Sequence, residues 1–432
     1  MKKISTLSIL IVFITTFAFG QTNTTKEGWK FGGGLPAIAF DSDTGFKYGA
    51  LAYINNYGDG SWYPNYLSQI YLEATYTTKG SGIFRVTYDD KKFLGSNIRF
   101  IGDVGYFTER GLDFYGYNGY EADYNSNFSD QQSDEYKSRM YYRIERQQLR
   151  GLFDFQFPLY ENKLRAMAGY TFYGINVAPV NVEKLNKGKS DENKLPAIAD
   201  STSLYQSYVE NGIIKADEKD GGYINHLKAG LIWDTRDNEA LPTSGIWTEA
   251  LLIGSIDAKN TNYKYLMATV THRQYFSLVK DRLSVAYRLI YSGKIAGDIP
   301  FYMLPYYMNT KEIRDGFGGS KTIRGVMRNR LVGDGVAIGN IEGRWRFFNA
   351  NIGSHEIYIA LSAFADAGMV TQNYNFTKPA NFYQADERLH IGYGGGIRFA
   401  YDQNMIVAVD YGLAKDKQDG TSGLYIGLGW LF

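Results

Sequence analysis

The sequence predicts an all-β fold, a single 16-stranded antiparallel transmembrane β-barrel. First, segments in which apolar and polar residues alternate recur from about residue 28 to the end of the chain, and a period of two is typical of strands with two different faces. Second, after residue 20 the 432-residue chain has no unbroken apolar run long enough for a spanning helix. Third, 16% of the residues are aromatic, including 37 Tyr, beside 48 Gly, as suits the interfacial girdles and tight turns of a membrane barrel. Only helices and closed barrels satisfy the hydrogen bonds of their backbone groups in lipid, so a closed barrel of strands is the remaining way for this chain to span a membrane.

The N-terminal residues 1–20 are typical of a removable export signal. Two lysines precede an apolar run from Leu7 to Phe19, and small residues lie on either side of Phe19. A membrane anchor would need roughly 20 apolar residues, and two threonines interrupt this shorter run. The expected organisation is therefore this signal, a short periplasmic segment at 21–27 that leaves no room for a folded domain, and the barrel at 28–432.

Sixteen segments bounded by turn residues are predicted as strands. They lie near residues 28–40, 46–56, 67–78, 81–89, 93–107, 138–157, 163–175, 222–234, 245–257, 263–276, 282–294, 336–348, 356–366, 389–401, 404–413 and 423–432. An even number lets an up-and-down barrel close with both termini on one side. Tight turns at 160–162, 279–281 and 402–404 alternate with long connections at 108–137, 176–221, 295–335 and 367–388. If both termini face the periplasm, the long connections lie outside the cell. A soluble all-β protein would show similar alternation and is the competing fold.

The last ten residues alternate almost perfectly. Leu424, Ile426, Leu428, Trp430 and Phe432 fall on one face, which we expect to meet lipid. The order Tyr425, Gly427, Trp430, Phe432 resembles the C-terminal signal by which outer-membrane barrels are handed to their insertion machinery. Both chain ends therefore indicate an integral protein of the bacterial outer membrane.

Three further segments identify a family resemblance. They are Trp233, Asp234, Arg236 and Asp237 at the end of the eighth predicted strand, residues 318–326 in the connection after the eleventh, and Phe364 to Gly368 at the end of the thirteenth. In combination they resemble the hallmarks of the BamA/TamA superfamily, the bacterial surface antigen family of assembly and secretion barrels. The resemblance covers essentially all of the chain after Gly221.

The resemblance implies a barrel that closes imperfectly between its first and last strands and a sixth extracellular loop that folds back into the lumen. The match places Arg324 at the tip of that loop, within the segment Ile323, Arg324, Gly325 and Val326. Val326 departs from the aromatic residue usual in the family. The implied wall partners of the arginine are Glu342 and Asp366.

Strand periodicity supports these partners independently. In the twelfth predicted strand Glu342 alternates with the apolar Ile341 and Trp345, and a charge on the lipid face would cost about 2–4 kcal/mol near the midplane. Glu342 must therefore face the lumen, and the same reasoning turns Asp366 inward on the next strand. An ordinary loop arginine and two solvated acids are the alternative interpretation of Arg324 and its partners.

Gly32, Gly33 and Gly34 lie in the first predicted strand. Consecutive glycines weaken a strand and remove side-chain packing, so this strand should pair poorly with the last one. A weak seam is what the lateral opening proposed for the family would need. The alternative is a bend, or a close fit against a neighbouring surface.

Composition limits the chemistry. The absence of cysteine excludes disulfides, thiolate nucleophiles, thiolate metal sites and a lipoprotein anchor. The four histidines show no metal-ligand spacing, and no nucleophile has a base beside it, so we expect no metal, no cofactor and no enzymatic activity. A formal net charge of +1, or −1 once the two signal lysines are removed, gives no reason to expect a nucleic-acid partner.

The leading functional hypothesis is a barrel-only member of the BamA/TamA superfamily, without periplasmic POTRA domains, that helps to insert or translocate proteins or lipids at the outer membrane. The missing domains suggest that it works in a complex with periplasmic or outer-membrane partner proteins. Two alternatives remain open: a passive pore, and a structural surface protein whose Tyr-rich loops bind an external partner. The sequence does not identify the client.

Overall fold

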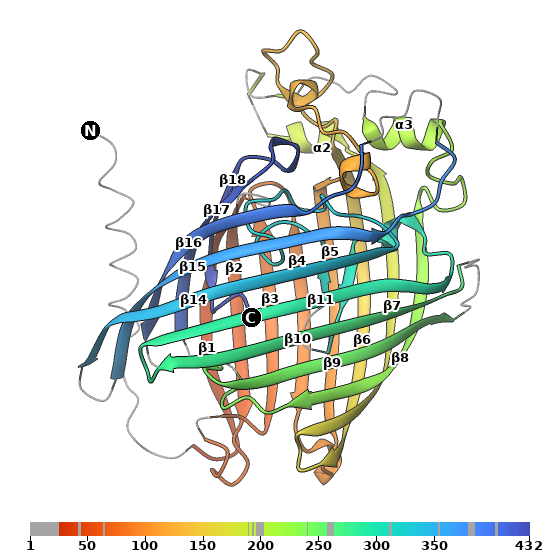
Figure 1. Ribbon diagram of the computed structural model, residues 1–432. Coiled ribbons are helices and arrows are strands. Elements are labelled where there is room, and N and C mark those ends of the chain that lie inside the picture. Colours follow the sequence, from red (N-terminus) through yellow and green to blue (C-terminus); the bar gives the residue numbers. More distant parts are fainter. Residues whose placement is uncertain are drawn as a thin grey trace.

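The computed structural model describes most of the chain as a closed antiparallel barrel (Figure 1). The described residues are 26–41, 45–63, 65–188, 190–191, 194–195, 203–239, 241–256, 263–310, 313–352, 355–378, 385–401 and 405–432. Within them sixteen strands follow one another around the barrel, which confirms the predicted fold class. The predicted export signal and the predicted turn at 402–404 lie outside these residues.

The barrel strands lie close to their predicted positions. They are β1 (Trp29–Asp41), β2 (Gly45–Asn56), β3 (Ser68–Thr77), β4 (Gly82–Asp90), β5 (Arg99–Asp113), β6 (Arg143–Tyr160), β7 (Leu164–Pro179), β8 (Gly221–Asp234), β9 (Gly245–Ile256), β10 (Tyr265–Val279), β11 (Leu283–Gly297), β14 (Gly335–Ile352), β15 (His355–Gln372), β16 (His390–Tyr401), β17 (Met405–Ala414) and β18 (Ser422–Leu428).

Several strand boundaries differ from the prediction by three or more residues. β15 pairs with β14 as far as Gln372, so the segment Phe364 to Gly368 lies inside a strand and does not end one. β5 and β6 both lie several residues later than predicted, because they pair with each other and move together. β18 ends at Leu428, four residues before the end of the chain.

The two faces of the wall differ as the alternation predicts. On β14, Ile341 and Trp345 are each 52% exposed on the outside, whereas Glu342 between them is fully buried. The register shifts between Arg346 and Phe348, and this bulge turns both Phe347 and Phe348 outward. The apolar outer face and the polar inner face are those of a membrane barrel.

The two ends of the barrel also differ. Short turns such as 161–163 and 280–282 join the strands at one end, which we call the short-turn end. The opposite loop end carries the long connections 114–142, 180–220, 298–334 and 373–389. These hold the short helices α2 (Val182–Asn186) and α3 (Leu204–Glu210) and a small sheet of β12 (Tyr306–Met308) and β13 (Ile313–Asp315). The connection after β11, expected to be strand-free, therefore contains a hairpin. None of the described helices is long and apolar enough to cross a membrane.

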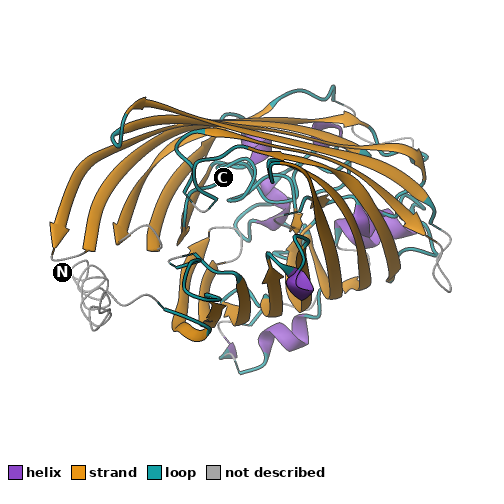
Figure 2. Ribbon diagram, turned by 90° about the horizontal axis from the view of Figure 1, so that it is seen from below, coloured by secondary structure: helices purple, strands orange, loops and turns teal. Residues whose placement is uncertain are grey.

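The long connections reach into the barrel (Figure 2). Their buried aromatic residues, such as Tyr208 and Phe301, join one apolar cluster with inner-wall residues that include Tyr173, Ile224 and Trp247. This cluster packs the loop segments against the wall from β6 to β10, and it fixes the connections that carry the candidate site.

Candidate functional site

The tip of the connection after β11 forms a tight turn deep in the barrel. The Thr322 hydroxyl donates to the Gly318 carbonyl oxygen and accepts from the Gly318 N–H, both at 2.8 Å. The Gly319 N–H donates to the Val326 carbonyl oxygen at 2.8 Å, and Gly325 has a φ of +95°. Glycine adopts this left-handed conformation without strain, so the turn can reverse direction immediately after Arg324.

The turn brings Arg324 against both predicted acidic residues. Its Nε and Nη2 donate to Asp366 Oδ2 and Oδ1 at 2.8 and 3.1 Å, and its Nη1 donates to Glu342 Oε2 at 2.9 Å. The backbone N–H of Arg324 also donates to Asp366 at 3.0 Å. All three side chains are at most 1% exposed. The planar guanidinium thus holds two carboxylates at once, which an ammonium group cannot reproduce.

Further charges on the same wall balance this group. Asp410 on β17 lies 3.6 Å from Arg324 Nη1 and accepts two hydrogen bonds from Arg398 of β16, at 2.7 and 2.9 Å. Arg344 on β14 donates from Nε to Glu342 at 3.1 Å. Three arginines and three carboxylates therefore form one buried network, in which each charge has at least one partner of opposite sign.

The segment Phe364 to Gly368 contacts the tip through its alternate residues. The ring centroid of Phe364 lies 3.4 Å from Arg324 Cζ, so the guanidinium stacks on an aromatic face. Asp366, on the same face of β15, accepts a hydrogen bond from Arg324. At Gly368, the next residue on this face, an added Cβ would come within 2.7 Å of the Ile323 side chain. One face of β15 thus supplies a ring, a carboxylate and an open space for the tip.

Glycines on β16 and β17 form the floor under the tip. A Cβ at Gly412 would lie 2.7 Å from the Gly325 nitrogen, and one at Gly392 would overlap the Arg324 carbonyl oxygen. Gly325 itself passes so close to the backbone of Leu413 that a side chain there has no room. The sequence reasoning missed Gly392, Gly412 and Asp410, because a local pattern does not reveal which strands a distant loop will cross.

Val326 packs firmly although it is not aromatic. Val326 and Ile323 are both fully buried in an apolar cluster that also contains Phe317, Leu331 and Val370. The loop tip is therefore held by apolar packing as well as by the ion pairs of Arg324.

Additional contacts fix the rest of this connection to the wall. The Thr310 N–H donates at 3.0 Å to Glu249 on β9, and the Thr310 hydroxyl donates to the same carboxylate. Arg328 donates to Glu109 on β5 at 2.6 Å. The loop is therefore held on both sides of the lumen, and Arg324 is one of several anchors.

A second buried cluster joins four connections at the loop end. The ring nitrogens of His390 lie 2.6 Å from Asp419 and 3.2 Å from Glu387, and the ring stacks on Tyr120 at 4.0 Å. Arg330, in the connection after β11, lies 3.5 Å from Asp419. Within the described ranges no group of three or more His, Asp or Glu side chains is placed to hold a metal ion.

The last four residues do not continue the outer face of β18. Gly429, with a φ of +78°, turns the chain inward, and Leu431 and Phe432 are buried. Arg344 Nη2 donates to the Phe432 backbone oxygen at 2.8 Å, and its Cζ lies 4.6 Å from the Trp430 ring centroid. The prediction that Trp430 and Phe432 face lipid is therefore wrong, because a glycine turn and the arginines of the inner wall draw the rings inside.

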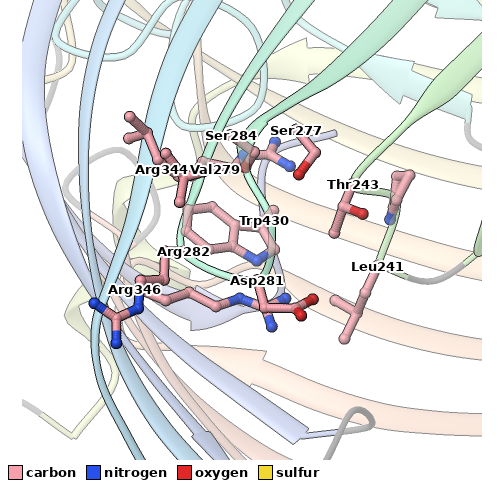
Figure 3. Close-up of a pocket in the computed structure, with 12 residues that line it drawn as sticks. Leu241, Thr243, Ser277, Val279, Asp281, Arg282, Ser284, Arg344, Arg346 and Trp430 are labelled. Atoms are coloured by element: carbon pink, nitrogen blue, oxygen red, sulfur yellow. The ribbon is translucent and has the colours of Figure 1, made fainter.

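Trp430 lies beside Leu241 and Arg282, in the β8–β9 and β10–β11 turns of the short-turn end (Figure 3). It borders a small cavity of about 30 Å³ together with Leu241, Arg282 and Arg346. Earlier in β18, Leu424 and Leu428 do face outward, at 36% and 56% exposed, and Tyr425 is buried inside. The Tyr425 hydroxyl oxygen accepts a hydrogen bond from the Gly325 N–H at 3.1 Å, so the loop tip also contacts the last strand. Gly427 makes no close contact, since a Cβ there would meet nothing within 4 Å.

The seam between the first and last strands is short. Among the described residues, β1 pairs with β18 at two positions, Phe40 with Ile426 and Asp41 with Tyr425, whereas β17 and β18 pair over seven residues. Gly32, Gly33 and Gly34 lie in the part of β1 that has no β18 partner in the described chain, and the register with β2 shifts between Phe31 and Gly33. The described pairs between these strands are few, but none of them involves the glycines, so a weakening of the seam by Gly32, Gly33 and Gly34 stays a prediction.

The segment Trp233 to Asp237 lies away from Arg324, in the β8–β9 turn at the short-turn end. Asp234 accepts from Arg236 Nε and Nη2 at 2.9 and 2.8 Å, and Asp237 accepts from the Thr243 N–H at 3.0 Å. Trp233 faces outward at 38% exposed. These residues organise their own turn, and the structure does not join them to the loop tip.

A barrel with an apolar outer face and a charged, loop-filled interior is an integral outer-membrane barrel. The chain belongs to the Omp85 superfamily, whose domain model matches residues 68–432. The predicted resemblance to BamA-type barrels is thus confirmed at the level of the superfamily.

Solved structures show the same fold. The chain is similar to BamA from Haemophilus ducreyi lacking POTRA domains 1–3, at 13% identity and a TM-score of 0.55, over 94% of this chain and 70% of that one. It is also similar to CdiB from Escherichia coli, at 7% identity and a TM-score of 0.54, over 95% of this chain and 64% of that one. The chain thus spans about two thirds of the length of these relatives. No curated protein sequence matches it significantly.

Proposed function

We propose that this chain assists the insertion or translocation of proteins, or of lipids, at the bacterial outer membrane by opening sideways between β1 and β18. The observation that carries the proposal is the two-residue pairing of these strands. Backbone groups without partners are costly in hydrocarbon, so the remaining edge of β1 is a place where another strand can add. Opening would break few hydrogen bonds and expose an edge ready to pair.

The loop tip would hold one side of this seam while the other side moves. Arg324 joins the inner wall at β14 and β15, and Gly325 contacts Tyr425 on β18. The strands from β14 to β18 are thereby tied to one loop, whereas the tip has no described hydrogen bond to β1. We assign Ile323, Arg324, Gly325 and Val326, with Glu342 and Asp366, the role of this latch.

A partner protein would complete the activity. BamA and CdiB are longer than this chain, which covers 70% and 64% of the chains compared, so the activity of the whole relatives comes to this protein only as a proposal. We propose a periplasmic or outer-membrane partner that delivers clients. We also retain the division into a signal at 1–20, a short segment at 21–27 and the barrel at 28–432, and a role that is not enzymatic.

A passive pore is less well supported. A pore needs an open lumen, whereas Tyr208, Phe301 and the loop tip are packed against the inner wall. Purified protein in planar bilayers should therefore show little steady conductance, and a large open channel that Arg324→Ala leaves unchanged would favour the pore.

Depletion and seam cross-linking test the proposal. Depletion should lower the abundance of other outer-membrane barrels. Because the chain has no cysteine, Phe40→Cys with Ile426→Cys would place one disulfide across the seam. The matched control joins Ile426→Cys to Val409→Cys within the β17–β18 pair. The seam disulfide should reproduce the depletion effect until it is reduced, and the control disulfide should not. Normal abundance with a fully formed seam disulfide would refute lateral opening.

A further inference from the structure

The turn between β4 and β5 carries an exposed leucine in a strained conformation. Leu94 is 88% exposed and has a φ of +52°, in the left-handed region that L-residues rarely adopt. Glycine would remove the strain, and a polar residue would suit water better. When an apolar residue occupies a position that is both strained and exposed, a contact partner is the physical explanation to seek.

The neighbouring Phe93 folds back over the outer face of the barrel. Its ring centroid lies 4.7 Å from that of Phe100 and 6.0 Å from that of Phe155, and these two rings lie 5.0 Å apart. Phe100 and Phe155 are paired neighbours on β5 and β6. The turn is therefore continuous with the lipid-facing surface and does not hang free below the barrel.

Several backbone groups of the turn are hydrogen-bonded within it. The Phe93 N–H donates to the Ile98 carbonyl oxygen at 2.9 Å, and the Gly95 N–H donates to the Lys92 carbonyl oxygen at 2.9 Å. The Ser96 hydroxyl donates to the Phe93 carbonyl oxygen at 2.6 Å and accepts from the Ile98 N–H at 3.1 Å. A turn with internally paired backbone groups can enter a region poor in water at little cost.

Charged and aromatic neighbours set the depth of the turn. Lys92 is exposed and its Nζ lies 5.9 Å from the Trp62 ring, and Lys91 Nζ lies 4.5 Å from the Tyr66 ring. Ammonium groups beside tryptophan and tyrosine are typical of the headgroup level of a bilayer, where they meet lipid phosphates.

We propose that the β4–β5 turn is a membrane wedge: Leu94 and Phe93 enter the phospholipid leaflet at the short-turn end, and Lys92 binds headgroup phosphate. The occupant is lipid, because the apolar surface of the turn continues the lipid-facing wall and its cations complement phosphate. The inference rests on the position of the barrel in a bilayer and is independent of transport.

Site-specific fluorescence tests the wedge, since the chain contains no cysteine. Leu94→Cys is labelled with an environment-sensitive fluorophore and reconstituted in vesicles of phosphatidylethanolamine and phosphatidylglycerol, with and without quencher-bearing lipids. Glu161→Cys, at the exposed tip of the β6–β7 turn, is the water control, and Val104→Cys, 48% exposed on the outer face of β5, is the lipid control.

The Leu94 probe should be quenched by lipids that carry the quencher near the headgroup and should be several-fold less sensitive to aqueous iodide than the Glu161 probe. Asn97→Cys, at the exposed end of the same turn, gives a second, shallower probe if the first variant folds poorly. Iodide sensitivity equal to that of the Glu161 probe, without lipid quenching, would overturn the wedge. It would assign Leu94 to water or to a protein partner that the vesicles lack.

Discussion

Replacement of Arg324 by lysine should loosen the latch even though it keeps the charge. The guanidinium donates three side-chain hydrogen bonds to two carboxylates, two to Asp366 and one to Glu342. An ammonium group is a single point of charge and cannot reach both acids in this geometry. In the described structure all the hydrogen bonds that Asp366 accepts come from Arg324. Asp366 therefore loses more of its hydrogen bonding than Glu342 when Arg324 is replaced.

The magnitude follows from burial. Each hydrogen bond to a charged group contributes about 1.5–3 kcal/mol, but these values are not additive within a network. Loss of one partner of a buried ion pair costs roughly 3–5 kcal/mol, and Arg324, Asp366 and Glu342 are at most 1% exposed. We therefore expect Arg324→Met to lower the free energy of unfolding by about 3–5 kcal/mol and Arg324→Lys by about 2 kcal/mol, since lysine keeps one contact.

Two assays measure this loss. Urea unfolding in detergent micelles, followed by tryptophan fluorescence, gives the global free energy of unfolding. Cleavage at Lys321 by a lysine-specific protease reports local release of the tip, and the fragment masses distinguish it from cleavage at the lysine that Arg324→Lys introduces. A loss of 2 kcal/mol corresponds to about thirtyfold faster cleavage at Lys321 when the loop recloses quickly. Asp366→Asn combined with Arg324→Met should restore part of the loss, because no bare charge remains.

The control is Arg346→Lys, on the same strand as Glu342. Arg346 is half-buried and stacks on the Tyr358 ring at 4.3 Å, without a described contact to the loop. If Arg324→Lys behaves like Arg346→Lys in both assays, the two-carboxylate geometry contributes nothing and the reasoning fails.

Three further predictions follow from the same structure. Gly412→Ala places a Cβ 2.7 Å from the Gly325 nitrogen and should speed cleavage at the tip, whereas Gly343→Ala, with nothing within 4 Å, should not; equal cleavage would contradict the glycine floor. Phe432→Ala removes the ring near Arg288 and Arg344 and should lower the free energy of unfolding by about 1–2 kcal/mol, so an unchanged urea midpoint would refute a role in packing. Burial raises the pKa of Glu218 above its usual 4.5, so the native state binds this proton more tightly and the loop assembly should lose stability as pH rises from 4.5 through the raised pKa. Glu218→Gln should flatten the rise of protease sensitivity with pH over this range, and a rise of equal size in both proteins would exclude Glu218 as its source.

Local patterns account for most of the fold. Alternation alone placed the strands and turned Glu342 and Asp366 inward, because one buried face and one lipid face impose a strict period of two. The contact of Arg324 with them came from the family resemblance, since no local signal shows that a loop enters the lumen.

Local patterns fail where a single backbone torsion or a distant strand decides the outcome. The alternation of Trp430 and Phe432 continues that of β18, yet Gly429 turns the chain before they can pair. Asp410 and Gly412 contact the loop tip only because the wall curves beneath it. The row of glycines around Gly392 was a visible signal that another backbone passes close by, and it suggested no partner.

The inward turn at Gly429 has a consequence for how the chain is recognised. Trp430 and Phe432, which resemble part of the outer-membrane sorting signal, lie among Arg288, Arg344 and Arg398 in the finished molecule. Because Phe432 is buried, we predict that a receptor that binds its ring engages the unfolded polypeptide and not the completed barrel. Folding itself would release the receptor, and a peptide tag joined to Phe432 would start inside the lumen and interfere with that release.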